Sequence, residues 1–237
     1  MDVLRSLLFV PAHRERMLES AAASKADALV LDLEDAVPER QKRQARDVAA
    51  AWIPRLAPRR RPVFVRLNGI ATGMTRDDLM AIVSKRLTGV VLPKVEDPQD
   101  LRDLDVLLRE AEMEHGVRPG DIGTIALIER ARGVLRCEDI ARASDRLMGL
   151  SVGAEDYTFD IGAPRGADAL RHIRATVVQG ATAYRLLAID TPYPDHRDEA
   201  GLEEETRAAR AIGLRGKYAI HPAQVAVINR VFTPAPE

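Results

Sequence analysis

Eight short apolar segments, separated by longer stretches with helical periodicity, constrain the fold of this chain more than any other feature. Each segment has five to seven residues, a length typical of a buried strand. Apolar residues spaced three and four positions apart in the intervening stretches are typical of amphipathic helices. We expect the strands at residues 6–11, 28–34, 63–68, 89–94, 125–129, 147–153, 183–189 and 217–222.

The order of these elements favours one fold over another. The clearest helices are expected at residues 13–24, 38–53, 97–116 and 199–213. Asp97-Pro98 is a typical helix start, and Gly116 and Gly213 are typical helix ends. Eight strands alternating with helices, without a linker-like stretch, predict a single-domain (β/α)8 TIM barrel over residues 1–237. A doubly wound open sheet is the alternative, but no glycine-rich dinucleotide-binding motif follows the first strand.

Composition excludes several classes of partner. The formal net charge is −1 and both signs are spread along the chain, so nothing predicts a nucleic-acid or membrane partner. The one dense basic stretch, residues 57–62, is interpreted as a solvated loop. No apolar run approaches the roughly 20 residues of a membrane span, and none fits a signal peptide. The single cysteine, Cys137, excludes an internal disulfide, and we expect it to be half-buried in a cytoplasmic protein.

Six of the eight expected strands end in charged residues or histidine. In a TIM barrel these ends form the mouth at which ligands bind. Solvation alone explains one charged strand end better than it explains six, so the pattern favours a binding site. Asp32 and Glu34 alternate with two leucines and therefore share one face of their strand. The other charged ends carry Arg66, Lys94, Glu129, Asp156 (which follows Gly153) and His221.

Two of these acids predict a metal site. Glu129 and Asp156 end neighbouring strands, so their carboxylates should converge, and such a pair repels unless a cation lies between its members. Oxygen ligands without nearby histidine or cysteine pairs suit Mg²⁺, with Mn²⁺ as the alternative. Arg66, across the mouth, offers a planar fork to a substrate carboxylate. Asp32 and Glu34 could orient Arg66 or hold metal-bound waters. The glycine before this turn should let a ligand approach the backbone.

Seven segments, in this order, resemble the citrate lyase beta-subunit-like family, which groups with malyl-CoA and citramalyl-CoA lyases and HpcH/HpaI-type aldolases. The segments are RSLLFVPA, DALVLDLEDAV, VFVRLNG, GVVLPKVE, ALIERARG, VGAEDYTFDIG and GKYAIHPAQ. The resemblance covers residues 5–233. LDLEDAV, VRLNG and GAEDY are specific in combination, although each alone is a weak signal.

This resemblance implies a TIM barrel that binds Mg²⁺ through Glu129 and Asp156, while Arg66 holds the substrate carboxylate. It also implies that backbone N–H groups of the turn Ala154-Glu155-Asp156 contact the bound oxo acid or enolate. The implied activity is Mg²⁺-dependent cleavage or formation of a carbon–carbon bond in a hydroxy-dicarboxylic acyl-CoA, such as citramalyl-, malyl- or citryl-CoA. Homo-oligomers, trimers or hexamers, are implied as well.

Several roles stay open at this point. Arg14 matches a family position near the CoA phosphates, or it is a solvated arginine at a helix start. A metal-bound water held by Asp32 or Glu34 would take the hydroxyl proton of the substrate, and His221 is interpreted as structural. The alternatives to an acyl-CoA lyase are a CoA-independent aldolase for hydroxy-oxo acids and an oxo-acid-binding subunit of a larger assembly.

The end of the sequence adds one expectation. Longer family members continue after IHPAQ with a helical lid, whose acidic residue reaches the site of a neighbouring subunit, whereas this sequence ends at Glu237. Either the protein lacks this lid, or the sequence has been cut short before it. A mouth without a cover stays wet, which weakens electrostatic interactions within it. We therefore expect binding of small oxo acids but slow turnover of CoA thioesters.

Overall fold

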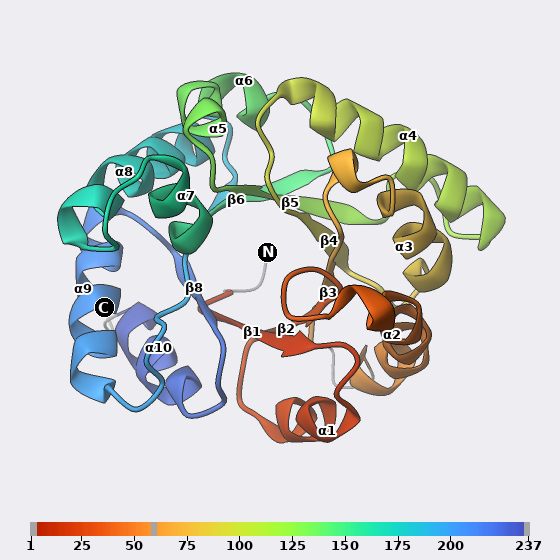
Figure 1. Cartoon of the computed structure of the whole chain (residues 1–237), viewed down its shortest axis with the longest axis horizontal. Coiled ribbons are helices and arrows are strands. Elements are labelled where there is room, and N and C mark those ends of the chain that lie inside the picture. Colours follow the sequence, from red (N-terminus) through yellow and green to blue (C-terminus); the bar gives the residue numbers. More distant parts are fainter. Residues whose placement is uncertain (1–3, 58–60, 235–237) are drawn as a thin grey trace.

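Eight parallel strands close into a barrel in the computed structural model, which describes residues 4–57 and 61–234 (Figure 1). The strands pair in chain order, and the last pairs with the first. They are β1 (Ser6–Pro11), β2 (Ala28–Asp32), β3 (Val63–Arg66), β4 (Gly89–Leu92), β5 (Gly123–Ile128), β6 (Leu147–Val152), β7 (Leu187–Asp190) and β8 (Gly216–Ala219). The predicted (β/α)8 TIM barrel is confirmed.

The helices form a ring around the outside of the barrel (Figure 1). They are α1 (Glu15–Ala23), α2 (Lys42–Leu56), α3 (Thr75–Ile82), α4 (Pro98–Glu114), α5 (Ala131–Leu135), α6 (Cys137–Ala141), α7 (Ala154–Asp160), α8 (Ala167–Ala183), α9 (Glu199–Ile212) and α10 (Gln224–Phe232). Two short 3-10 helices, η1 (Glu39–Gln41) and η3 (Ile70–Thr72), lie in the loops. The four clearest helices of the sequence correspond to α1, α2, α4 and α9.

Local hydrogen bonds explain where these helices begin and end. Asp97 caps α4 by accepting a hydrogen bond from the N–H of Gln99, and Asp100 accepts one from the N–H of Asp97, which completes a capping box. Gly116 and Gly213 have φ angles of 62° and 118°, in the left-handed region that favours glycine. The predicted start of α4 and the two predicted helix ends are confirmed.

The predicted boundary of the seventh strand is wrong. The sequence indicated a strand over residues 183–189, but α8 continues to Ala183 and β7 starts only at Leu187. The N–H of Arg185 bonds back to the carbonyl of Thr182, and Arg185 itself has a left-handed φ of 58°. Apolar residues in this turn therefore imitate the start of a strand.

Alternation along the strands produces two cores. One set of side chains fills the barrel, and it consists of Leu4, Leu7, Ala28, Val30, Phe64, Val91, Ile125, Leu127, Ile189 and Tyr218. The alternate side chains, including Leu29 and Leu31, pack against the helices. Because inward positions recur every second residue, Asp32 follows Val30 on the inner face at the mouth, as the sequence predicted.

A buried ion cluster lies between the barrel and its helical ring. Lys217 of β8 contacts Asp190 of β7 at 2.6 Å and Glu205 of α9 at 2.8 Å. Arg174 of α8 forms two hydrogen bonds with Asp190, at 2.8 and 3.0 Å. This cluster connects the last two strands to the last two long helices.

Three further sequence predictions concern this part of the structure. Cys137 is free and buried, more deeply than predicted, and burial raises the pKa of its thiol to about 11. Of the basic stretch 57–62, residues 58–60 lie outside the described residues. In the described part of the chain, none of the helices has the length and apolar character needed to cross a membrane.

We expect Lys217→Met to lower the free energy of unfolding by about 3 kcal/mol, since removing one partner of a buried ion pair leaves an uncompensated charge. The measurement is urea unfolding, with the exposed Lys85 changed to methionine as the matched control. A loss below about 1 kcal/mol would show that the cluster contributes no more than a surface ion pair.

Candidate active site

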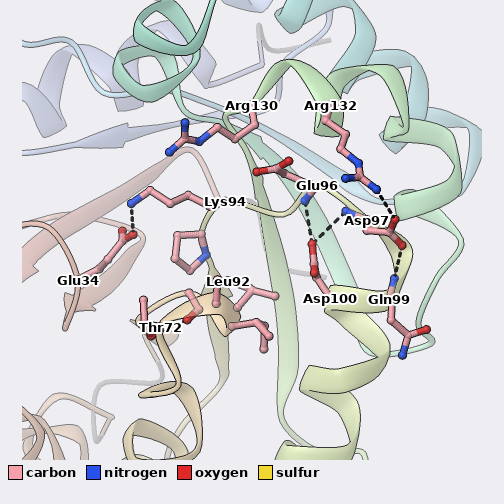
Figure 2. Close-up of a pocket in the computed structure, with 14 residues that line it drawn as sticks. Glu34, Thr72, Leu92, Lys94, Glu96, Asp97, Gln99, Asp100, Arg130 and Arg132 are labelled. Atoms are coloured by element: carbon pink, nitrogen blue, oxygen red, sulfur yellow. Dashed lines mark hydrogen bonds and ion pairs between the residues drawn. The ribbon is translucent and has the colours of Figure 1, made fainter.

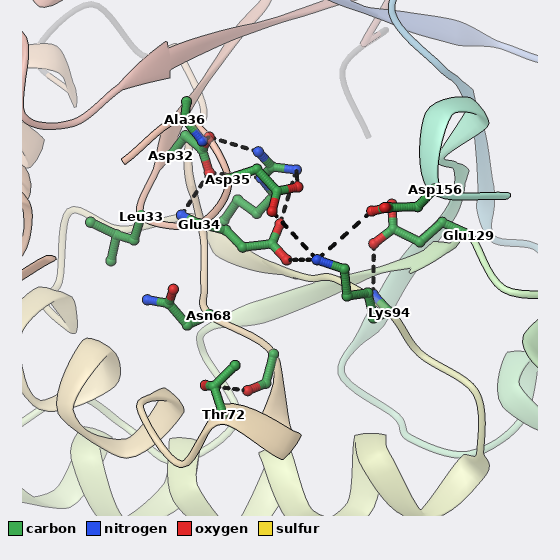
Figure 3. Close-up of polar contacts among 12 residues, drawn as sticks. Asp32, Leu33, Glu34, Asp35, Ala36, Asn68, Thr72, Lys94, Glu129 and Asp156 are labelled. Carbon is green, nitrogen blue, oxygen red and sulfur yellow. Dashed lines mark hydrogen bonds and ion pairs between the residues drawn. The ribbon is translucent and has the colours of Figure 1, made fainter. Parts of the chain in front are cut away.

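Seven described charged side chains lie close together at the mouth of the barrel, and Figure 3 labels all of them except Arg66. They come from the carboxyl ends of β2 to β5, or the loops directly after them, and from the first turn of α7, which follows β6. The group, called the carboxylate site below, consists of Asp32, Glu34, Asp35, Arg66, Lys94, Glu129 and Asp156. The sequence placed all of them except Asp35 at the mouth, although it gave Lys94 no specific role there.

Arg66 is held by the acids that end β2. Its Nε and Nη2 donate to the two oxygens of Asp32, at 2.7 and 2.6 Å, and its Nη1 forms an ion pair with Glu34 at 3.0 Å. The ring of Phe9 lies against the guanidinium, 4.9 Å from ring centre to Cζ. Asp32 thus takes one edge of the fork, so a substrate carboxylate would be left with the outer N–H groups on the two terminal nitrogens.

These contacts determine the charge states of the two β2 acids. Burial raises the pKa of Asp32, but the charge and hydrogen bonds of Arg66 outweigh it, so the pKa lies below its ordinary value. Burial also raises the pKa of Glu34, and here neither Arg66 nor Lys94 fully compensates, so the pKa lies above its ordinary value. Asp32 is therefore a fixed anion, whereas Glu34 binds a proton more readily.

Lys94 contacts both sides of the mouth. Its Nζ lies 2.5 Å from Glu34, 3.5 Å from Asp35 and 3.7 Å from Asp156, and its backbone N–H donates to Glu129 at 2.8 Å. Burial lowers the pKa of the ammonium, but the hydrogen bond and charge of Glu34 raise it above its ordinary value. The φ of Lys94 is 53°, a left-handed conformation that is uncommon outside glycine.

Glu129 is buried, like Asp32 and Glu34, and is only 3% exposed. Burial, followed by the charges of Glu34 and Asp156, raises the pKa of Glu129 to about 8. Gly153, at the end of β6, lies so close that a Cβ there would be 2.2 Å from Oε2 of Glu129. The sequence indicated that this glycine gives a ligand access to the backbone, whereas the structure shows that it makes room for Glu129.

The Glu129–Asp156 pair fits a hard divalent cation. Figure 3 shows the two carboxylates adjacent to each other on one side of Lys94. Across residues 4–57 and 61–234, three or more His, Cys, Asp or Glu side chains nowhere gather into a metal-binding group. Two carboxylates suffice for Mg²⁺, which keeps several waters or substrate oxygens among its ligands. Burial, and after it the charges of Glu34 and Asp156, raises the pKa of Glu129, and a cation bound to both carboxylates would favour their ionised forms.

Two cavities include residues of the carboxylate site. The smaller, about 140 Å³, is lined by Arg66, Glu129 and Asp156 together with Phe9 and Tyr218. The larger, about 540 Å³, has Lys94 in its wall and is lined by both acids and arginines (Figure 2). Its lining includes Glu34, Thr72, Leu92, Lys94, Glu96, Asp97, Asp100, Arg130 and Arg132.

Comparison with known families settles the relationship of the chain. A family model described as HpcH/HpaI aldolase/citrate lyase matches residues 5–222, most of the chain. The chain belongs to the HpcH/HpaI aldolase/citrate lyase family. This confirms the resemblance seen in the sequence motifs.

Individual members of this family match over almost the whole chain. The citrate lyase subunit beta of Leuconostoc mesenteroides subsp. cremoris is 34% identical over 232 residues, covering 97% of this chain and 77% of the relative. The L-malyl-CoA/beta-methylmalyl-CoA lyase of Cereibacter sphaeroides is 34% identical over 253 residues, covering 98% and 79%. The structure of the citrate lyase beta subunit from M. tuberculosis complexed with oxaloacetate and magnesium is similar, with a TM-score of 0.80, 33% identity and 98% coverage of both chains.

In the turn that carries Asp156, one of the backbone N–H groups that the resemblance implied for substrate binding already has a partner. The N–H of Ala154 donates to the hydroxyl of Thr191 at 3.1 Å, so it is not free for a substrate. The side chain of Glu155 turns toward Arg165, at 2.9 Å. Of the three turn residues, Asp156 is the one whose side chain belongs to the carboxylate site.

Two other residues named from the sequence lie outside the carboxylate site. Arg14, at the start of α1, donates to the ring of His13 at 2.8 Å and lines a separate cavity of about 710 Å³. Its role in binding the CoA phosphates of this family stays a prediction. His221 stacks on His196, with ring centres 4.5 Å apart, and accepts a hydrogen bond from the N–H of Ala223, which agrees with a structural role.

Glu129 should make the metal-free protein less stable as the pH rises. Its folded pKa of about 8 lies above the ordinary 4.5, so the stabilisation is complete below pH 4.5 and is lost as the pH rises toward 8. Glu129→Gln removes this dependence, so the unfolding free energy of the variant relative to the wild type should rise by about 1.4 kcal/mol per pH unit within that window.

Urea unfolding in EDTA at several pH values within that window measures this difference. The exposed Glu114, changed to glutamine, is the control and should show no such trend. A difference between the Glu129→Gln variant and the wild type that stays constant with pH would contradict the raised pKa.

Proposed function

We propose that this chain is a Mg²⁺-dependent carbon–carbon lyase that cleaves or forms a hydroxy-dicarboxylic acyl-CoA, such as citramalyl-, malyl- or citryl-CoA. The observation that carries the proposal is the Glu129–Asp156 pair, which lines one small cavity together with Arg66. Support also comes from the relatives, which are named citrate lyase subunit beta and malyl-CoA/beta-methylmalyl-CoA lyase, and from the related structure that contains magnesium and oxaloacetate.

Glu129 and Asp156 are the residues that would hold Mg²⁺, and Mn²⁺ would use the same oxygen ligands. When bound, the ion would supply a Lewis acid next to the enolate oxygen formed by carbon–carbon cleavage. Gly153 would let Glu129 keep its position, because a side chain at residue 153 would occupy the same space.

Arg66 would bind the substrate carboxylate through its outer N–H groups. Asp32 holds the opposite edge of the guanidinium with two hydrogen bonds, so the group is fixed before the substrate arrives. Holding the substrate carboxylate in one place aligns the scissile bond with the catalytic groups, which lowers the barrier to its cleavage.

Proton transfer is assigned to Glu34 rather than to Asp32. Both oxygens of Asp32 already accept hydrogen bonds from Arg66 and from backbone N–H groups, and its pKa is lowered. Glu34 has a raised pKa and lines the larger cavity. Glu34, directly or through one water, would therefore take the hydroxyl proton of the substrate.

A CoA-independent aldolase for hydroxy-oxo acids is the second candidate. The cavity of about 140 Å³ that Arg66, Glu129 and Asp156 line favours a small oxo acid. The cavity lined by Arg14 distinguishes the two candidates. A CoA-dependent lyase would use Arg14 there to bind the CoA phosphates, whereas the aldolase would have no use for such a basic subsite. An oxo-acid-binding subunit of a larger assembly would bind the same acid without turnover.

The organisation of the protein is proposed in the same terms. We infer a single domain over residues 1–237, a cytoplasmic location and a homo-oligomer, a trimer or hexamer. The closed barrel supports the single domain. Family membership supports the cytoplasmic location and the homo-oligomer.

Purified protein with Mg²⁺ should turn over at least one of malyl-, citramalyl- and citryl-CoA. Glu129→Gln and Asp156→Asn should abolish turnover while circular dichroism stays unchanged, and Glu114→Gln serves as the control on an exposed acid. Turnover of free hydroxy-oxo acids alone would support the aldolase. No turnover of any of these would overturn the enzymatic proposal in favour of the binding subunit.

Arg66→Lys should weaken the binding of oxaloacetate or pyruvate by about tenfold or more, because one ammonium cannot replace the planar fork or keep both bonds to Asp32. Calorimetry in saturating Mg²⁺ measures this affinity. Arg118→Lys, on the surface, should leave it unchanged. Wild-type affinity in the Arg66→Lys variant would rule out the carboxylate-binding role.

A further inference from the structure

We propose that Lys94 is a built-in counter-cation of the carboxylate site, which neutralises its acids in the metal-free protein and competes with the divalent ion for them. This inference rests on the proposed metal site at Glu129 and Asp156. It assigns Lys94 a function of its own, which is to set the affinity of that site for the ion.

The position of the ammonium carries the first part of the inference. Nζ of Lys94 lies between the two walls of the mouth, within 2.5 Å of Glu34 on one side and 3.7 Å of Asp156 on the other (Figure 3). Asp35 adds a third carboxylate at 3.5 Å. A single ammonium is therefore in ion-pair contact with three carboxylates.

The backbone of Lys94 ties the same residue to the other proposed metal ligand. Its N–H donates to Oε1 of Glu129 at 2.8 Å. Its φ of 53° costs conformational energy in a residue with a Cβ, and such a conformation persists only when surrounding contacts hold it. The backbone of Lys94 thus contacts Glu129, and its side chain contacts Asp156. A change in the position or charge of either acid therefore alters a contact of Lys94.

The charge balance shows why the ammonium competes with an ion. The carboxylate site contains five acids and two cations, and Arg66 is committed to Asp32 by two hydrogen bonds. Among the described residues, Lys94 alone forms an ion pair with Asp156. A divalent ion at Asp156 and Glu129 would meet this ammonium as a like charge at close range, and like charges at such distances disfavour each other.

Calorimetric titration of the metal-free full chain with MgCl₂ tests the inference. Lys94→Met removes the charge and keeps most of the volume, so it should bind Mg²⁺ about tenfold more tightly, in line with the effect of one nearby unit charge on a carboxylate. Lys94→Arg keeps the charge and should bind like the wild type. Arg185→Met is the matched control, because Arg185 also has a left-handed φ, of 58°, but lies in the turn before β7.

Thermal unfolding supplies a second measurement that does not depend on metal affinity. In EDTA, Lys94→Met should melt at a lower temperature than the wild type and than Arg185→Met, since the acids lose their counter-charge. Saturating Mg²⁺ should reduce the difference in melting temperature between Lys94→Met and the wild type. Lys94→Gly, which suits the left-handed backbone, gives the same comparison if the methionine variant does not fold.

The outcomes separate this inference from the proposed function. Wild-type protein that does not bind Mg²⁺ would overturn both. Wild-type protein that binds Mg²⁺, with Lys94→Met binding equally or more weakly, would overturn the counter-cation role alone and leave the metal site standing.

Discussion

Repulsion among carboxylates at the mouth of the barrel is the constraint on which the rest of the site depends. Alternation along the strands places Asp32, Glu34 and Glu129 on the inner face, where the barrel core excludes water. Arg66 neutralises the first two, and Lys94 connects Glu34 to Asp156. Glu129 receives no such cation among the described contacts, which is why burial and neighbouring charge raise its pKa to about 8. A divalent ion held by Glu129 and Asp156, as proposed, would supply the positive charge that Glu129 lacks.

Much of this was predictable because period and position are local properties of a sequence. Strand spacing predicted the barrel, and strand-end charges predicted that Asp32, Arg66, Glu129 and Asp156 converge. The contact of Lys94 with Asp156 was not predictable, because it depends on a left-handed backbone at a lysine and on a side chain that crosses between strands. Nor does the sequence show whether the absence of a side chain at Gly153 makes room for a ligand or for a neighbouring side chain. Those features depend on three-dimensional packing, which no short motif contains.

Two charged clusters lie on different faces of the barrel wall. The Asp190–Lys217 cluster stabilises the fold, and the carboxylate site is the proposed site of the chemistry. Asp190 and Lys217 lie outside the barrel, under α8 and α9, where every charge has a partner of opposite sign. The carboxylate site lies inside the mouth and has more acids than cations. A balanced cluster holds elements together, whereas an unbalanced one is suited to bind an ion, and family membership agrees with that division.

The central claim is that Glu129 and Asp156 together hold the divalent ion. It is tested most directly by a crystal structure of the protein grown with Mn²⁺, using X-rays above the manganese absorption edge. The account predicts one anomalous peak at the mouth, in direct contact with carboxylate oxygens of both Glu129 and Asp156. An anomalous peak at any other group of acids, with the mouth free of manganese, would contradict it.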